Sequence, residues 1–256
     1  MKWRSLEESN PGIDTRTLRE QLAERKELIA KYVPLDAQAV HVRAIAELQR
    51  QRILDRVLPV GAKYPPFELA DHNGNAVSSS EELGRGLLII CFFRGRWCPF
   101  CVAQLEAMNR IVPEIKKAAA TLMAISPQTV QQSFFMADQH KLRFPLLSDR
   151  GNQVARRFGL VYRVPEYQQE VYRHAFINLP FANGDEGWEL PIPATFVVDR
   201  DETVLYAAAD PDYTTRPARA NRNSGTTRRL TALPKRCLAG CGKTRESLLH
   251  RGRAVL

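Results

Sequence analysis

The chain has 256 residues, 44% of them hydrophobic, which is enough to bury a sizeable core in one large domain with additions. No run of about 18 apolar residues could span a membrane, and the opening residues MKWRSLEE lack the apolar centre of a signal peptide, so we expect a cytoplasmic protein. The net charge of +9 comes entirely from the end of the chain, because residues 1–210 hold 26 Lys and Arg against 26 Asp and Glu.

Two amphipathic helices are predicted before residue 58. Residues 15–32 and 37–57 both carry apolar side chains at helical spacing, and Pro34 and Pro59 punctuate them. The simplest interpretation is a hairpin that packs on its own domain. A homodimer interface is the alternative.

A Cys-x-x-Cys pair follows a buried strand and opens a helix. The apolar run Leu87–Phe93 is long enough for a strand but too short for a typical buried helix, and Arg94-Gly95-Arg96 ends it. From Cys98 onward the apolar residues recur at helical spacing, with Pro99 at the first helical position. The pattern therefore predicts Cys98 as the helix N-cap.

This placement favours redox chemistry. A thiolate is the nucleophilic form of cysteine, and at Cys98 it would gain from the unpaired N–H groups of the helix and from Arg94 and Arg96. Cys101 lies one turn along the same face, so a reversible Cys98–Cys101 disulfide is expected, with one cysteine attacking and the other resolving. Half of a zinc site is the alternative, but no second pair with ligand spacing occurs nearby.

The remaining segments alternate between strand and helix, which is typical of an α/β layer fold with a mixed central sheet. Strands are predicted at 121–126, 144–147, 195–199 and 203–208, and helices at 129–140 and 152–158. Residues 161–190 form a long insertion rich in aromatic residues, just before Pro193. This insertion either walls the active site and selects the substrate or packs as a lid on its own aromatics.

Several segments together resemble the peroxiredoxin-like branch of the AhpC/TSA family, from about Thr17 to Pro217. They are VGA (60–62), PFEL (66–69), FRGRWCPFC (93–101), AISPQ (124–128), FPLLSD (144–149), VARRFGL (154–160) and LPIPATFVVD (190–199). The resemblance implies a thioredoxin-like fold with a mixed central sheet flanked by helices, here preceded by the helical hairpin. It also implies thiol-dependent antioxidant chemistry without a metal or organic cofactor.

The chain departs from true peroxiredoxins at two places. Their Pro-x-x-x-Thr-x-x-Cys motif, laid on this chain, puts Arg94 at the proline, Cys98 at the threonine and Cys101 at the peroxidatic cysteine. Pro193 stands where peroxiredoxins carry an arginine, and it resembles the cis-proline that faces the dithiol of thioredoxins. We expect Arg94, Arg96, Trp97, Pro193 and Thr195 to stabilise the thiolate or to form the bed for the substrate.

Two chemistries follow from this comparison. In the first, the thiolate of Cys101, at the peroxidatic position, attacks a hydroperoxide and the neighbouring thiol resolves the sulfenic acid. In the second, Cys98 attacks a protein or glutathione disulfide and Cys101 releases the mixed disulfide. Thioredoxin or glutathione would supply the electrons in either case. A non-catalytic thioredoxin-fold binding module is a third alternative.

The predicted organisation has three parts. Residues 1–57 form a helical extension, residues 58–212 the thioredoxin-like domain, and residues 213–256 a basic tail with little apolar periodicity that predicts disorder. The family resemblance stops near Pro217, as a shifted reading frame at the end of the gene would produce. A nucleic-acid-binding arm is the other interpretation, but aromatic residues are not interleaved with the charges.

Overall fold

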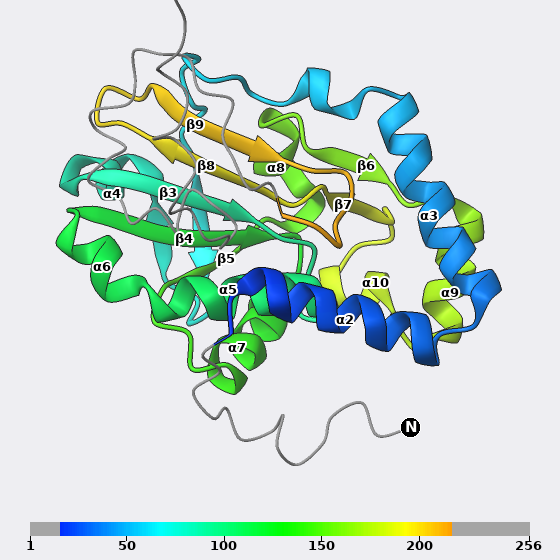
Figure 1. Ribbon diagram of the computed structural model, residues 1–256. Coiled ribbons are helices and arrows are strands. Elements are labelled where there is room, and N and C mark those ends of the chain that lie inside the picture. Colours follow the sequence, from blue (N-terminus) through cyan, green and yellow to red (C-terminus); the bar gives the residue numbers. More distant parts are fainter. Residues whose placement is uncertain (1–15, 217–256) are drawn as a thin grey trace, which may run out of the picture.

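A computed structural model describes residues 16–216 of the protein (Figure 1). It holds a seven-stranded mixed sheet in the order β2-β1-β5-β4-β3-β8-β9, in which β3, β4 and β5 are parallel and the other pairings are antiparallel. The strands are β1 (Glu68–Asp71), β2 (Ala76–Ser78), β3 (Leu87–Phe92), β4 (Ala120–Ser126), β5 (Leu146–Ser148), β8 (Ala194–Val198) and β9 (Val204–Ala209). The predicted mixed sheet is confirmed.

Helices cover both faces and one end of this sheet. They are α2 (Leu18–Tyr32), α3 (Leu35–Arg50), α4 (Ser79–Arg85), α5 (Pro99–Arg110), α6 (Val112–Lys117), α7 (Val130–Gln139), α8 (Gln153–Arg157), α9 (Glu166–His174) and α10 (Leu179–Asn183), with short 3-10 turns at Ile53–Arg56 and Arg150–Asn152. The insertion adds α9, α10 and a separate ribbon of β6 (Val161–Arg163) with β7 (Glu189–Pro191).

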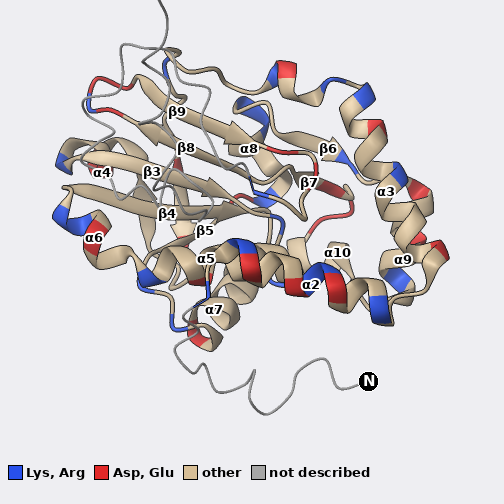
Figure 2. Ribbon diagram, in the orientation of Figure 1, with Lys and Arg blue, Asp and Glu red and all other residues tan. Residues whose placement is uncertain are grey.

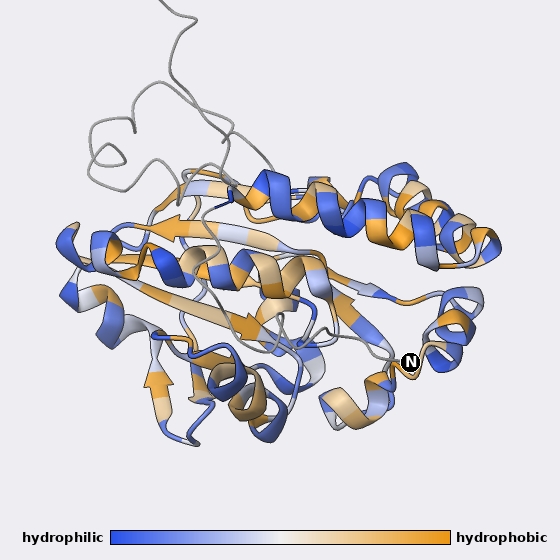
Figure 3. Cartoon of the chain, turned by 60° about the horizontal axis from the view of Figure 1, so that its bottom comes forward, coloured by the Kyte–Doolittle hydropathy of each residue, from blue (hydrophilic) through white to orange (hydrophobic). Residues whose placement is uncertain are grey.

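Strand β3 shows why the core has two halves. Its side chains alternate between the faces, so Ile89 and Cys91 join the cluster under α5, whereas Ile90 and Phe92 join the cluster on the opposite face. The central strands β3 and β4 carry no charged residue, whereas the helices, the loops and some outer strands such as β6 and β7 do (Figure 2). The hydropathy colouring shows the same division, with orange strands and helices that are partly blue (Figure 3).

The N-terminal helices pack on the domain that follows them. A capping box joins Thr17 and Glu20 at the start of α2, which runs along α5 (Figure 1) and buries Leu18 and Leu22 in the α5-side core. Helix α3 packs on α9, where Tyr167 Oη donates a hydrogen bond to Glu47 at 2.5 Å. The hairpin is therefore packed against its own domain.

The structure corrects the prediction for residues 213–216, which were assigned to the disordered tail. Tyr213 is only 7% exposed, and Asp210 and Asp212 organise the turn by accepting hydrogen bonds from Thr215 Oγ1 and from the Thr214 backbone N–H. Aspartate side chains commonly fix such turns. The rest of the predicted tail lies outside the described residues. No helix within 16–216 is long and apolar enough to cross a membrane.

Candidate active site

The dithiol lies where β3 gives way to α5. Cys98 has extended backbone angles and is the N-cap of α5, with Pro99 at the first helical position, so that prediction is confirmed. The Cys98 carbonyl accepts hydrogen bonds from the backbone N–H groups of Cys101 and Val102, at 3.0 and 3.1 Å. Both thiols are free and buried, with Cys98 2% exposed and Cys101 fully buried.

A glycine shapes the loop between the strand and the helix. Gly95 has a φ of +149°, a region that side chains rarely adopt, and its carbonyl accepts the N–H of Cys98 at 3.1 Å. A Cβ at this position would lie 2.5 Å from Trp97 Nε1. The loop can therefore fold tightly enough to hold Arg94 beside Cys98 only with glycine here.

Arg94 is a buried cation that lies beside the Cys98 thiol. It is 1% exposed, its Nη1 lies 4.0 Å from Cys98 Sγ, and its Nη2 donates a hydrogen bond to Tyr172 Oη. Its guanidinium also lies over the rings of Tyr213 and Trp97, at 3.8 and 4.8 Å from their centroids. Although burial opposes them, the tyrosines Tyr162, Tyr172 and Tyr213 and the Cys98 thiol raise its pKa.

The environment separates the pKa values of the two thiols. Burial alone would raise the pKa of Cys98, but a hydrogen bond from the Cys101 thiol and the charges of Arg94 and Arg216 lower it to about 5. Burial and the hydrogen bond to Cys98 raise the pKa of Cys101 well above its usual value. At neutral pH the pair therefore holds one negative charge, centred on Cys98.

Arg216 is a site residue that the sequence did not reveal. Its Nη2 donates a hydrogen bond to Cys101 Sγ at 3.5 Å, and its Nε donates one to Gln104 of α5. Gln104 in turn donates to Thr195 Oγ1 at 3.5 Å. The predicted residue Thr195 thus belongs to the same hydrogen-bonded group, one step away from the sulfur.

Arg96 and Pro193 lie differently from the predictions. Arg96 is exposed and donates to Gln132 of α7 at 2.9 Å, so the charges that lower the Cys98 pKa are those of Arg94 and Arg216. Pro193 follows a trans peptide bond, since the described residues contain no cis bond, so it lacks the cis bond of the thioredoxin proline that it resembles. Its position just ahead of β8 keeps its missing N–H outside the ladder of that strand.

The insertion and the N-terminal hairpin both reach this site. The Tyr172 ring of α9 packs against Trp97 with centroids 5.4 Å apart and planes tilted by 56°, and the ring centroids of His41 (α3) and Tyr172 are 5.8 Å apart. Burial and the charge of Arg94 lower the pKa of His41 to about 4, so it is neutral near pH 7. One face of the insertion therefore walls the site, whereas its Phe176 and Phe181 are 91% and 70% exposed.

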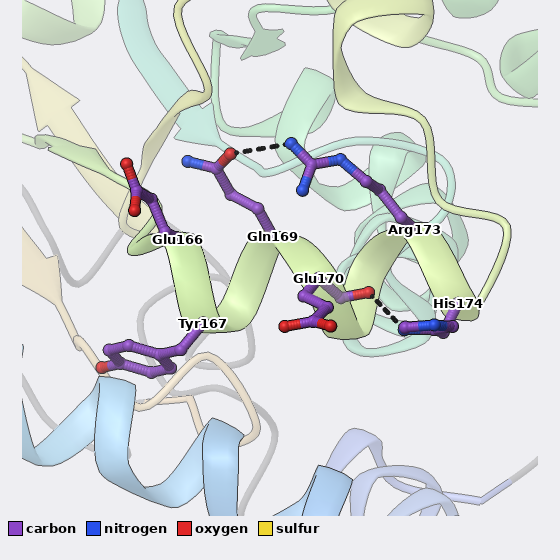
Figure 4. Close-up of a pocket in the computed structure, with 6 residues that line it drawn as sticks. All are labelled: Glu166, Tyr167, Gln169, Glu170, Arg173 and His174. Atoms are coloured by element: carbon purple, nitrogen blue, oxygen red, sulfur yellow. Dashed lines mark hydrogen bonds between the residues drawn. The ribbon is translucent and has the colours of Figure 1, made fainter.

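A surface pocket lies elsewhere, along α9. It has a volume of about 580 Å³ and is lined by Glu166, Tyr167, Gln169, Glu170, Arg173 and His174 (Figure 4). Two of its hydrogen bonds stay within the helix, from Arg173 to Gln169 and between His174 and the Glu170 carbonyl. Neither cysteine lines this pocket.

Comparison with known proteins matches this architecture. The AhpC/TSA family model matches residues 60–207. The chain is 33% identical over 115 residues to chloroplastic peroxiredoxin Q of Sedum lineare, covering 45% of this chain and 61% of the relative. It is 30% identical over 103 residues to peroxiredoxin Bcp of Escherichia coli, covering 40% of this chain and 65% of the relative.

A solved structure supports the fold. The peroxiredoxin 6 of Arenicola marina, in a cysteine-to-serine mutant form, superposes with a TM-score of 0.50 at 18% identity and covers 65% of this chain and 68% of that one. The chain spans less than two thirds of the length of the two curated relatives above, but the family model covers more than half of the chain. The chain therefore belongs to the AhpC/TSA family.

Proposed function

We propose that the protein is a thiol-dependent oxidoreductase that cycles Cys98 and Cys101 between dithiol and disulfide. The observation that carries this proposal is the environment of Cys98, which combines a guanidinium 4.0 Å from its sulfur with a hydrogen bond from the Cys101 thiol. A buried thiol without a redox role has its pKa raised by burial, as for Cys91, whose pKa is about 11. Cys98 has the opposite shift.

The same environment supports Cys98 as the attacking residue and Cys101 as the resolving residue. In disulfide exchange, the Cys98 thiolate attacks one sulfur of a substrate disulfide and expels the other as a thiolate. Cys101 then loses its proton and attacks Cys98 Sγ, which releases the second half of the substrate and leaves the Cys98–Cys101 disulfide. The substrate gains two electrons and the dithiol loses two.

Hydroperoxide reduction is the second candidate, and Arg94 favours it. The Cys98 thiolate would attack the peroxide oxygen, with the alkoxide leaving as alcohol after protonation, and Cys101 would convert the sulfenic acid to the disulfide with release of water. The charge that develops on the departing oxygen needs a nearby cation, and the Arg94 guanidinium is already beside the sulfur. The peroxiredoxin relatives support this candidate as well.

Thioredoxin or glutathione is the proposed electron donor, and the proposed location is the cytoplasm, where a dithiol is kept reduced for further turnover. We also propose a homodimer, in which the outer side of the packed N-terminal hairpin would form the interface.

A substrate panel tests the proposed function. Fully reduced protein is mixed with hydrogen peroxide, an organic hydroperoxide or oxidised glutathione, and the loss of two hydrogen atoms on formation of the Cys98–Cys101 disulfide is followed by mass spectrometry. Formation of that disulfide with at least one substrate is expected, and the relative rates assign the substrate class. If no substrate oxidises the pair while free thiols in the same sample react, the chain is a non-catalytic thioredoxin-fold module.

A further inference from the structure

We propose that Arg216 activates the resolving cysteine, by stabilising the thiolate that Cys101 must form once Cys98 has reacted. The proposal rests on the proposed dithiol function and adds a catalytic group to it. The guanidinium touches a reacting atom, because its Nη2 lies 3.5 Å from Cys101 Sγ. It comes from the far end of the described chain, across 115 positions from Cys101.

The guanidinium of Arg216 is fixed by its other hydrogen bonds. Its Nη1 donates to the backbone carbonyls of Tyr213 and Thr215, at 2.7 and 2.5 Å, and its Nε donates to Gln104 Oε1. The turn that carries it is itself held by Asp210, whose N–H donates to the Pro193 carbonyl at 3.3 Å. Because these bonds occupy Nε and Nη1, Nη2 is left to bond the sulfur, and the side chain is oriented toward Cys101 before any reaction takes place.

The two cysteines have different arginines beside them. Arg94 Nη1 lies 4.0 Å from Cys98 Sγ, and Arg216 Nη2 lies 3.5 Å from Cys101 Sγ. In the resting state the single negative charge is on Cys98, and the Cys101 thiol donates a hydrogen bond to it. Two cations therefore face one anion, and the second cation is placed at the sulfur that carries no charge.

The second cation becomes important after the first step. When Cys98 is joined to a substrate sulfur or oxygen, it no longer carries a charge, so it no longer repels a thiolate on Cys101 or accepts its proton in a hydrogen bond. The buried Cys101 must then ionise, and a cation within about 4–6 Å lowers a thiol pKa by about 1–3 units. Within residues 16–216, Arg216 is the cation that donates a hydrogen bond to that sulfur.

Each resolving step balances with this assignment. For a mixed disulfide, Cys101 gives its proton to solvent, its thiolate forms the bond to Cys98 Sγ, and the bond from Cys98 to the substrate sulfur breaks to release a thiolate. For a sulfenic acid, the same attack breaks the S–O bond of Cys98, and the hydroxide that leaves becomes water. Arg216 changes no covalent bond in either case.

The two steps can be separated in one stopped-flow trace with dithiobis(nitrobenzoate), an aromatic disulfide whose thiolate product is coloured. Attack by Cys98 releases the first equivalent, and resolution by Cys101 releases the second. We expect Arg216→Met to slow the second phase by about threefold to tenfold near neutral pH, because the smaller thiolate fraction of Cys101 outweighs its gain in nucleophilicity. The pH midpoint of this phase should move upward by about one unit or more. The first phase should change much less.

Controls distinguish activation from a structural role. Arg200→Met removes another arginine that donates to a backbone carbonyl, that of Arg85 at 3.2 Å, and both phases should keep their rates. Arg216→Lys keeps the positive charge and should restore most of the lost rate in the second phase. Gln104→Leu leaves Arg216 in place without its anchor and should slow the second phase to an intermediate rate.

Two results would overturn the proposal. In the first, the second phase of a folded Arg216→Met variant keeps the wild-type rate and pH midpoint. In the second, both phases slow equally and Arg216→Lys restores neither, which shows that the residue only holds the fold. If the wild-type protein releases no coloured thiolate at all, the proposed dithiol function fails, and this inference fails with it.

Discussion

Replacing Arg94 by methionine should raise the pKa of Cys98 by about two units. At 4.0 Å, two unit charges attract by about 4 kcal/mol when the effective dielectric constant is about 20. Since one pKa unit corresponds to about 1.4 kcal/mol, this attraction sets an upper limit of about three units. A nearby opposite charge typically shifts a pKa by about 1–3 units, and the charge of Arg216 and the Cys101 hydrogen bond remain in the variant.

The rate of alkylation reports this change. Iodoacetamide reacts with the thiolate, and peptide mass spectrometry restricts the reading to Cys98. At a pH below the wild-type pKa, where Cys98 is mostly protonated in both proteins, a two-unit rise in its pKa lowers the thiolate fraction about 100-fold. The more basic thiolate is nearly tenfold more nucleophilic, so the net alkylation rate of Cys98 should fall about tenfold. The pH midpoint of alkylation should move from about 5 toward neutrality.

Arg96→Met is the matched control, because Arg96 is exposed and bonded to Gln132. It should move the midpoint by less than about half a unit, as expected for a solvated charge. Equal shifts in Arg94→Met and Arg96→Met would refute the argument, since only Arg94 is buried beside the sulfur.

Two further changes test the surroundings of the dithiol. The pKa of Cys98 is about 5 in the folded protein and 9.0 ordinarily, so between these pH values the unfolded chain binds more protons. The difference in unfolding free energy between the reduced protein and Cys98→Ser should therefore rise with pH in this range, and its pH-dependent part should disappear below pH 5. Denaturant titrations that show a constant difference would contradict this. Gly95→Ala should destabilise the protein by about 2 kcal/mol more than Gly61→Ala. Both glycines have a positive φ, but of the two only Gly95 has a close neighbour, since Trp97 Nε1 would lie 2.5 Å from the new Cβ. Equal midpoints of the two variants in thermal unfolding would show that this contact relaxes freely.

The local parts of the site could be predicted from the sequence. An apolar strand, a Gly-containing break and Pro99 at the first helical position determine by short-range preferences that Cys98 caps a helix, and the structure confirms it. The paired strands β8 and β9 follow equally from local alternation around a turn. These features need no knowledge of which segments meet in space.

The long-range parts could not be predicted. Tyr172 contacts Arg94 from 78 positions away, and Arg216 contacts Cys101 from 115 positions away. The aromatic insertion suggested a wall for the site but did not indicate which tyrosine would reach Arg94, and nothing near Arg216 marks it. The turn-forming Asp-Pro-Asp sequence before Tyr213 was the available signal for an ordered end, but the basic composition that follows it suggested a tail beginning there. The resemblance of Pro193 to a cis-proline rested on its place in the sequence alone, and a trans bond is equally compatible with a position just before a strand.

Trapping the intermediate shows whether Cys98 attacks and Cys101 resolves. Reduced Cys101→Ser and Cys98→Ser variants are each mixed with oxidised glutathione and with hydrogen peroxide, and the adducts are located by peptide mass spectrometry, with dimedone as the trap for sulfenic acid. We expect a stable adduct on Cys98 in Cys101→Ser, formed at close to the wild-type rate with at least one of the two substrates, and a much slower reaction or none in Cys98→Ser. A rapid adduct on Cys101 in Cys98→Ser, with an unreactive Cys98 in the other variant, would contradict it and make Cys101 the attacking residue.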